Sequence, residues 1–496
     1  MTPQPLLRAG DRVLVGATLV EVDQDLAAAL RPGDRVLGVA SLGILRVVPS
    51  AVARLVDEAV SAARDAFFEM SRIDHTAVTR FFELAAARLA DDVLFTPIAA
   101  ANADDVAAAA ARGRSTTRLE LSQEMRRDMI ESLRLWRDMP TESGPRERIV
   151  HDGWTVEEWT APLGVVGFVF EGRPNVFADA TGVLRSGNTV VFRIGSDALG
   201  TARAIMQNVV RPALADAGLP VGAVVLIESQ EHAAGWALFA DDRLALAVAR
   251  GSGSAVAELG SIARQSGVPV SLHGTGGAWM IVGHDADIAR VSQVIEHSLD
   301  RKVCNTLNVV CLPRTRADEL AGVVVAAADR AAARRGLNAR FHGVGQAAEL
   351  LRRHAPGETE VTRAHGTVVE ARVSECSESD LAVEHEWEQN PEVSVVLVDG
   401  INHAVELFNA WSPRFVASVV TGSDTERDDA FAALDAPFIG DGFTRWVDGQ
   451  FALLRPELGL SNWQTGRLFA RGGVLAGDSV YTVRLRVNQS DPGLRR

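Results

Sequence analysis

The chain has 496 residues, of which 64 are acidic and 50 basic, so its formal net charge is −14. Hydrophobic residues make up 47% and charged residues 23%, a composition typical of folded globular proteins and not of disordered ones. The length fits two or three domains, each large enough to bury a core. The acidic balance disfavours binding to nucleic acid, which needs clustered cations.

The reactive residues restrict the possible chemistry further. Three scattered cysteines, Cys304, Cys311 and Cys376, are too few for a disulfide scaffold or a zinc cluster, and we expect no metal. The single lysine, Lys302, leaves no P-loop and only one position for a Schiff base. No apolar run reaches the ~18 residues of a membrane span and no signal peptide is evident, so we expect a cytoplasmic protein without membrane contact.

Residues 1–50 are predicted to form a small β-rich extension, because 13–20 and 35–48 are rich in β-forming residues. The sequence does not indicate what this extension does. From Val52 apolar residues recur at helical spacing, and alanine-rich helices follow to about residue 139. No internal repeat is evident.

After residue 164 short apolar segments alternate with amphipathic ones. Strands are expected at 165–170, 189–193, 223–227, 244–249 and 268–272, and helices at 179–185, 198–217, 231–239 and 254–265. This alternation predicts a doubly wound parallel sheet. A second α/β region begins near residue 273, with strands expected at 278–282, 308–312, 393–398 and 415–421 and a helix at 287–299. The segment 451–487 is expected to be irregular and then extended.

Loops that follow the strands are candidate binding sites, because ligands of such sheets bind at the carboxyl ends of the strands. They are 170–175, 193–197 and 250–254. Gly251 and Gly253 form only part of a dinucleotide fingerprint, since residue 256 is valine, and a plain structural turn is equally consistent. Ser196 has a similar alternative, as a helix cap without a ligand.

Cys304 is the candidate nucleophile. It follows the cations Arg301 and Lys302 and precedes polar residues, at a possible helix start, and both features favour a thiolate. A small core residue is the alternative interpretation. Cys311 lies inside an apolar stretch and is assigned to the core.

Several motifs together carry a resemblance to a known family. They are Ala-Pro-Leu-Gly-Val-Val-Gly at 161–167, Glu-Gly-Arg-Pro-Asn-Val at 171–176, Ser-Gly-Asn-Thr-Val at 186–190, Val-Cys-Asn at 303–305 and Ala-Arg-Gly at 470–472, with Ala-Ala-Ala-Asn at 99–102. In combination they resemble the aldehyde dehydrogenase family, and within it the gamma-glutamyl phosphate reductase branch. The resemblance covers roughly residues 55–490.

The resemblance implies an α/β architecture of two doubly wound domains with a small oligomerisation element. The β-rich extension would span 1–50, a nicotinamide cofactor-binding domain 51–272 with an oligomerisation hairpin at 149–162, a catalytic domain 273–450, and a tail 451–496 that returns to the cofactor domain. A homo-oligomer, dimer or tetramer, is implied.

The implied reaction is the NADPH-dependent reduction of an acyl phosphate, by default L-glutamyl 5-phosphate, to the semialdehyde with release of phosphate, in amino-acid biosynthesis. Cys304 would form a thioester, and Asn175 with the Cys304 N–H would form the oxyanion hole. A partner kinase is implied as the source of the acyl phosphate, and NADH stays open as a cofactor. The residues implied for the cofactor are Arg193, Gly195, Ser196, Arg250, Gly251, Ser252 and Glu386, and Arg173 and Asn305 are expected at the substrate. Lys302, Arg414 and Arg455 are candidates for binding a further anionic group of the substrate, and ordinary surface cations are an equally consistent interpretation.

Some segments depart from the pattern of the family. His273 stands where aldehyde-oxidising relatives carry the glutamate that activates water for hydrolysis, which favours reduction. The branch pattern changes at 278–279, 411–416 and 455–462, so we expect kept catalytic machinery and altered substrate loops, with a different acyl phosphate as an open alternative. Two rivals are an NAD(P)-dependent aldehyde or acyl-thioester oxidoreductase and a non-catalytic binding protein of the same fold.

Overall fold

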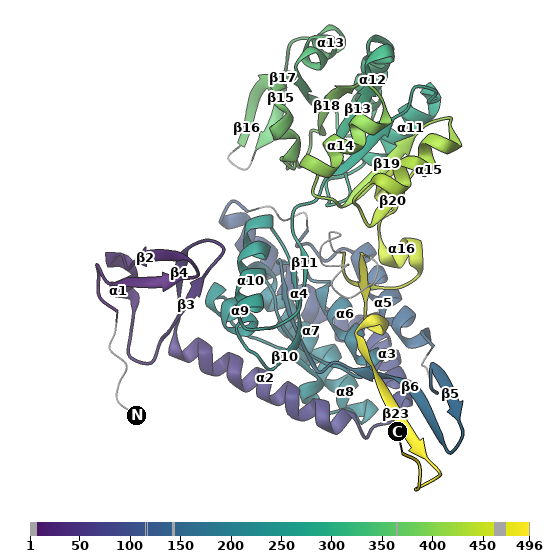
Figure 1. Ribbon diagram of the computed structural model, residues 1–496. Helices are drawn as coiled ribbons and strands as arrows, with labels where there is room; N and C mark the ends of the chain where they lie inside the picture. The colour runs from purple at the N-terminus through teal and green to yellow at the C-terminus, as the bar shows by residue number, and fades with distance from the viewer. Residues whose placement is uncertain are drawn as a thin grey trace. The chain divides into compact units, whose positions relative to one another are not determined.

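The computed structural model describes residues 7–114, 116, 118–140, 144–363, 366–460 and 473–495. The chain forms two compact units (Figure 1), the first made of Met1–Gly274, Leu454–Gly459 and Leu475–Arg496, the second of Thr275–Leu453 and Leu460–Val474. Residues 461–462 and 470–472, which belong to segments compared with the family above, lie outside the described residues. Among the described helices, none has the length and apolar character that a membrane span requires.

The first unit is built on a five-stranded parallel sheet of order β11-β10-β7-β8-β9. Helices cover both faces, so the strands are almost entirely buried and read as apolar runs. The strands are β7 (Val165–Phe170), β8 (Thr189–Arg193), β9 (Val224–Leu226), β10 (Leu244–Arg250) and β11 (Val270–His273). The alternation predicted for this region is confirmed.

The helices of the first unit fall into two groups around this sheet. One core joins the sheet to α2 (Ser50–Met70), α9 (His232–Phe239) and α10 (Gly253–Gln265). The others are α3 (His75–Ala90), α4 (Asp92–Ala111), α5 (Gln123–Asp138), α6 (Val176–Thr181), α7 (Leu199–Ile205) and α8 (Arg211–Ala217). The helix predicted at 198–217 is interrupted, because a π-helical turn, η3 (Met206–Val210), separates α7 from α8.

The N-terminal extension consists of two antiparallel hairpins, β1 (Arg12–Val15) with β2 (Thr18–Glu21) and β3 (Arg35–Val39) with β4 (Ile44–Val48), joined by α1 (Gln24–Ala29). The expectation of no repeat is wrong here. Arg-Ala-Gly-Asp-Arg-Val-Leu at 8–14 recurs as Arg-Pro-Gly-Asp-Arg-Val-Leu at 31–37. The two copies fold alike, since Asp11 and Asp34 accept the backbone N–H three residues earlier at 2.7 and 2.8 Å.

The two hairpins of the extension have different surroundings. The second packs against α9 and α10 with Val39 and Val48 in the shared core. Gln265 of α10 donates to the Gly38 carbonyl at 2.6 Å and accepts the Ala40 N–H at 2.8 Å. The first hairpin packs on a small core that it shares with Val36 and Leu45 of the second.

A three-stranded antiparallel sheet joins distant parts of the first unit. β6 (Trp154–Pro162) pairs with β5 (Glu147–His151) on one side and with β23 (Tyr481–Gln489) on the other (Figure 1). Val150, Leu485 and Val487 of these strands are 71, 66 and 56% exposed. The sheet therefore presents apolar side chains to solvent.

The second unit is built on a seven-stranded sheet of order β17-β14-β18-β13-β12-β19-β20, in which all pairs are parallel. The strands are β12 (Ala278–Val282), β13 (Leu307–Pro313), β14 (Arg340–Val344), β17 (Val373–Cys376), β18 (Glu392–Val398), β19 (Val416–Val420) and β20 (Phe438–Gly440), with a separate hairpin β15 (Glu358–Arg363) and β16 (Gly366–Ala371).

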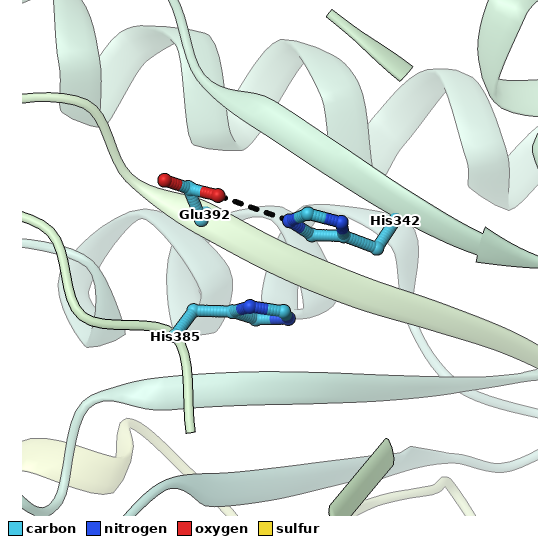
Figure 2. A group of neighbouring side chains, drawn as sticks. All are labelled: His342, His385 and Glu392. Carbon is cyan, nitrogen blue, oxygen red and sulfur yellow. Dashed lines mark hydrogen bonds and ion pairs between the residues drawn. The ribbon is translucent and has the colours of Figure 1, made fainter. Parts of the chain in front are cut away.

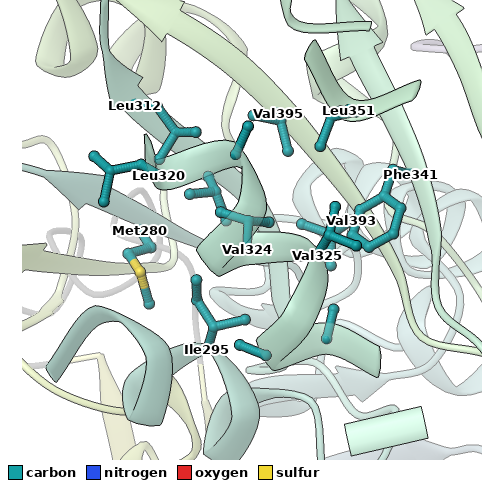
Figure 3. Packing of buried hydrophobic residues seen from close by; sticks show 14 of the residues in the cluster. Met280, Ile295, Leu312, Leu320, Val324, Val325, Phe341, Leu351, Val393 and Val395 are labelled. Carbon is teal, nitrogen blue, oxygen red and sulfur yellow. The ribbon is translucent and has the colours of Figure 1, made fainter. Parts of the chain in front are cut away.

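Two cores flank this second sheet. On one face α11 (Ile288–Ser298), α12 (Ala317–Ala333) and α13 (Gln346–His354) bury Leu320, Val324 and Leu351 against Met280 and Phe341 (Figure 3). On the other, α14 (Ile401–Trp411) and α15 (Asp424–Ala433) enclose a core with Trp279 and Phe408. Both faces are covered, which leaves the loops at the strand ends as places for ligands.

Candidate active site

Cys304 lies in a turn between α11 and β13 and is partly exposed. The Thr306 hydroxyl holds this turn, since it accepts the Val303 N–H at 2.9 Å and donates to the Arg301 carbonyl at 2.7 Å. The expectation that Cys304 begins a helix is wrong, because the element that follows is a strand. Because no helix begins at this turn among the described residues, no helix N-terminus stabilises the thiolate form of Cys304 there.

Asn305 fixes the turn from the other side. Its side chain donates to the Val447 carbonyl at 2.6 Å and accepts a hydrogen bond from Arg445, while its carbonyl accepts the Thr444 hydroxyl at 2.7 Å. The residue is only 4% exposed. We interpret Asn305 as a residue that positions Cys304.

A glycine loop packs directly on the nucleophile turn. The Gly277 N–H donates to the Cys304 carbonyl at 2.7 Å. A Cβ atom at Gly276 would lie 2.4 Å from the same carbonyl oxygen, closer than real contacts allow. Residue 276 must therefore be glycine for the turn to keep this geometry.

Lys302 does not project freely toward a substrate. Its ammonium group forms an ion pair with Glu384, and their side chains are 6 and 12% exposed. Glu386, the residue expected at the nicotinamide ribose, lies 4.0 Å from the same ammonium and is 73% exposed. The turn of Cys304 thus has a buried cation that is already neutralised.

The other two cysteines have environments that disfavour a thiolate. Cys311 is fully buried in β13, as predicted, and burial raises its pKa far above the usual range. Burial, with Asp380 and Glu375 nearby, raises the pKa of Cys376 to about 11.

In the first unit, the loops after β7 and β8 pack closely together. A Cβ atom at Gly195 would lie 2.6 Å from the Gly172 nitrogen, so backbone meets backbone there. Arg193, the last residue of β8, is 5% exposed and donates to the Gln230 carbonyl at 3.2 Å. Burial lowers its pKa, and its Nε atom is buried without a hydrogen-bond partner among the described residues.

Asn175 and Arg173 lie in the loop after β7. The Oδ1 atom of Asn175 is buried and has no hydrogen-bond partner in the described chain. Arg173 lies 3.6 Å from Glu171, and Arg118 lies 3.8 Å from the same carboxylate. The end of β7 is therefore followed by the buried amide oxygen of Asn175 and by a cluster of charges around Glu171.

The loop after β10 is held by ion pairs. Arg250 contacts Asp179 at 3.1 Å and Glu457 at 3.4 Å. The Gly251 N–H donates to the His273 carbonyl at 3.1 Å. Ser252 is the N-terminal cap residue of α10, and its side chain makes no capping hydrogen bond.

An arginine pair that the sequence did not single out faces the loop after β8. Arg112 and Arg114, which follow the C-terminus of α4, both contact the carboxylate of Asp197 at 2.7 Å. Ser196 precedes this carboxylate and begins a short 3₁₀ turn, η2 (Ser196–Ala198). More than 80 residues separate the partners, so no local pattern indicates the contact.

The two remaining substrate candidates are ion-paired at the surface. Arg414 contacts Asp435 at 2.7 Å and is 50% exposed, and its φ of 53° is unusual for a non-glycine residue. Arg455 contacts Asp478 at 3.2 Å and is 56% exposed. Their roles in substrate binding stay predictions.

His342, His385 and Glu392 lie within reach of one another, and their ligand atoms are all within 4.8 Å (Figure 2). The two imidazole rings stack at 4.1 Å with an angle of 11°. A metal ion lies close to the ring plane of a ligating histidine at about 2.0–2.1 Å, so two parallel stacked rings do not converge on one ion.

Side chains of the protein also provide ion-pair and hydrogen-bond partners for this cluster. Glu392 contacts His342 at 3.0 Å, Arg340 at 2.9 Å and Arg363 at 2.5 Å, and His385 bonds the Ser394 hydroxyl at 2.7 Å. Burial alone would raise the pKa of Glu392, but these contacts outweigh it and lower the pKa to about 2. We interpret the cluster as a buried ion-pair network of the second sheet.

Comparison with known proteins assigns the chain to a family. The model of the aldehyde dehydrogenase family matches residues 40–439. The chain belongs to the aldehyde dehydrogenase family. The predicted family and fold class are confirmed, with antiparallel strands added at the N-terminus.

Curated relatives narrow the assignment within the family. Gamma-glutamyl phosphate reductase of Novosphingobium aromaticivorans is 29% identical over 438 residues, covering 86% of this chain and 94% of its own. That of Methylobacterium radiotolerans is 31% identical over 344 residues, covering 68 and 71%. This member of the family is therefore an oxidoreductase, a reductase of a small-molecule substrate with a nicotinamide cofactor.

Solved structures share the fold. Gamma-glutamyl phosphate reductase from Thermotoga maritima superposes with a TM-score of 0.74 at 23% identity, covering 89% of this chain and 100% of that one. Rhodopseudomonas palustris propionaldehyde dehydrogenase, crystallised with CoA and an acylated cysteine, gives 0.62 at 16% identity, covering 89 and 98%.

Proposed function

We propose that the chain is an NADPH-dependent acyl phosphate reductase that releases phosphate and forms an aldehyde through a thioester on Cys304. The observation that carries the proposal is the identity of about 30% to relatives named gamma-glutamyl phosphate reductase, together with a partly exposed cysteine in the Val-Cys-Asn turn. L-Glutamyl 5-phosphate is the default substrate, and a partner kinase is its proposed source.

The proposed chemistry uses groups of this chain in sequence. The Cys304 thiolate attacks the acyl carbon, the carbon–oxygen bond to phosphate breaks, and inorganic phosphate leaves. When bound, a nicotinamide cofactor would supply the hydride for the thioester carbon. Collapse of the hemithioacetal breaks the carbon–sulfur bond, releases the aldehyde and returns the thiolate. Asn175 and the Cys304 N–H are the proposed donors to the carbonyl oxygen.

The carboxyl ends of the first sheet suit a dinucleotide. Gly195 permits close approach of backbone, the Arg193 Nε atom is a buried donor without a protein partner among the described residues, and Ser252 precedes the N-terminus of α10. Such ends of parallel strands and helix starts are where doubly wound sheets bind dinucleotide phosphates. Arg193, Gly195, Ser196, Gly251 and Ser252 are the residues that would hold the cofactor there, with Arg250 and Glu386 proposed as further contacts.

The preference for NADPH rests on the arginine pair at Asp197. An acidic residue near the end of the second strand in such sheets bonds the ribose hydroxyls of NADH, whereas arginine accommodates a 2′-phosphate. Here Arg112 and Arg114 neutralise that carboxylate and are 49 and 53% exposed. Both can turn toward a phosphate dianion.

We also propose a homo-oligomer formed through the exposed sheet of β5, β6 and β23. Its exposed apolar residues include Val150 and Leu485, and an apolar sheet surface of this kind is stabilised by a second copy. Size-exclusion chromatography with light scattering tests this, and Leu485→Asp should shift the mass toward the monomer.

The proposed activity is tested by a cofactor-oxidation assay with enzymatically generated acyl phosphates, the glutamyl one included. We expect phosphate and aldehyde in equal amounts, and no product with Cys304→Ala. An acyl-CoA arm tests the acyl-thioester alternative. Reduction of acyl-CoA with no turnover of any acyl phosphate would contradict the proposal.

A further inference from the structure

The one lysine of the chain is used beside the candidate nucleophile. Lys302 precedes Cys304 by two residues. All other residues of the chain that are counted as lysine or arginine are arginines. Its ammonium group is almost completely buried against Glu384. A buried charge is stable only when it is paired and hydrogen-bonded, so this position demands its partner.

Glu384 reaches two loops at once. One carboxylate oxygen binds Lys302, in the turn 301–306, and the other accepts the Gly276 N–H at 2.5 Å. Gly276 is the residue that packs on the Cys304 carbonyl. A single carboxylate therefore links both loops that contact Cys304.

The backbone around Glu384 is itself anchored to the strand that follows Cys304. The Asn308 side chain in β13 donates to the Val383 carbonyl at 2.9 Å and accepts the His385 N–H at 2.9 Å. These two hydrogen bonds flank Glu384 on either side. The carboxylate is thus held at a fixed place relative to the start of β13.

We propose that Glu384 is a positioning residue for Cys304, which fixes the turn 301–306 against Gly276 and cancels the charge of Lys302 beside the thiol. The inference deepens the proposed function and rests on Cys304 being the nucleophile. Lys302 acts with Glu384 in this role and not as a free contact to the substrate phosphate.

The charges near the turn make the role measurable. Besides Lys302 and Glu384 they include Arg301, Glu386 at 4.0 Å from the ammonium, and Asp300 with Arg445 at 2.7 Å. Arg335 donates to the Asp300 carbonyl, and His385 lies close enough for the Lys302 charge to lower its pKa. Removal of Glu384 takes away the nearer of the two carboxylates at Lys302 and leaves the turn of Cys304 with more positive charge, which favours the thiolate. Removal of Lys302 leaves an unneutralised carboxylate, which disfavours it.

The test is the pH dependence of Cys304 alkylation by iodoacetamide, read by peptide mass spectrometry on the full chain. For Glu384→Gln we expect the apparent pKa of Cys304 to fall by about 0.5–1, which increases alkylation at neutral pH about threefold or more. For Lys302→Met we expect a shift of similar size in the opposite direction. The double variant should return close to the wild-type profile, and aldehyde formation should fall in all three.

Glu296→Gln is the matched control, because Glu296 on α11 also binds two cations, Arg330 and Arg334, at 2.8 and 2.9 Å, and none of the three belongs to this turn. It should leave the alkylation profile unchanged. If Glu384→Gln does not fold, Glu384→Asp and the double variant supply the same comparison. Unchanged profiles in folded Glu384 and Lys302 variants would overturn the inference. A shifted profile in a chain that reduces no acyl phosphate would instead count against the proposed function alone.

Discussion

Arg46 in the N-terminal extension and Glu258 on α10 form a two-pronged ion pair, with distances of 2.6 and 3.3 Å. Arg46 also lies over the Trp236 ring, 5.1 Å from its centroid. The hydrogen bond to Glu258 raises the pKa of Arg46 above its ordinary value. The second hairpin of the extension is therefore attached to the first unit by a specific polar contact as well as by its valines.

We predict that Arg46→Ala lowers the free energy of unfolding by about 1 kcal/mol, since it removes a bidentate ion pair and a cation–π contact. Thermal unfolding measures this. Arg54→Ala, an exposed arginine on α2, is the control and should have little effect. An equal loss in both variants would contradict the specific role of Arg46.

Gly276→Ala should reduce aldehyde formation by about 10²-fold. The new Cβ atom would lie only 2.4 Å from the Cys304 carbonyl oxygen, so the turn that carries Cys304 must shift. Small misplacements of reacting groups cause losses of this size. The rate of Cys304 alkylation should change in parallel. Gly442→Ala, where a Cβ meets nothing within 4 Å, is the matched control. Full activity of Gly276→Ala would show that the loop does not position the nucleophile.

Replacing the arginine pair should change cofactor preference. We predict that Arg112→Ala with Arg114→Ala lowers kcat/KM for NADPH about tenfold and leaves that for NADH nearly unchanged, because charge-assisted hydrogen bonds to a 2′-phosphate are lost. Arg88→Ala, which breaks a comparable surface pair with Asp216 at 2.9 Å, should alter neither. Equal losses with both cofactors would contradict a role in 2′-phosphate recognition.

Acid should destabilise the second unit through His385. Burial lowers the pKa of His385 most and the neighbouring His342 lowers it further, to about 3, below its unfolded value near 6.5. The unfolded chain therefore takes up a proton first, and the stability that the neutral ring contributes is lost as pH falls from about 6.5 toward 3. Between pH 6.5 and 5, the free energy of unfolding of His385→Gln should fall by about 1.5 kcal/mol less than that of the wild type, as measured in denaturant titrations.

His284→Gln, an exposed histidine with 64% of its side chain accessible, is the control for that comparison and should retain the wild-type slope. An unchanged slope in His385→Gln would show that another group takes up the proton.

The sequence predicted the parallel sheets well, because strands buried on both faces are short apolar runs whose ends are marked by turns. β7, β8 and β12 begin and end at the expected residues. The π-helical turn after α7 was not predictable, since its residues continue a helical apolar pattern. The short repeat in the extension was readable from 8–14 and 31–37 but was missed.

The candidate site was only partly predictable. Cys304 and Asn305 lie in one motif, and local spacing places them in one turn. Glu384 and Arg112 carry no local signal, because their partners Lys302 and Asp197 are more than 80 residues away along the chain. Long-range ion pairs of this kind depend on how strands and loops come together, which periodicity does not encode.

The most direct test of the central claim is intact-protein mass spectrometry during incubation with glutamyl phosphate in the absence of NADPH. The account predicts one added acyl group, located on the peptide that contains Cys304, with one phosphate released per adduct and aldehyde formed when NADPH is then added. Cys304→Ala should show no adduct, and Cys376→Ser should behave as wild type. Aldehyde formation by the Cys304→Ala variant, or an adduct on another residue, would contradict the account.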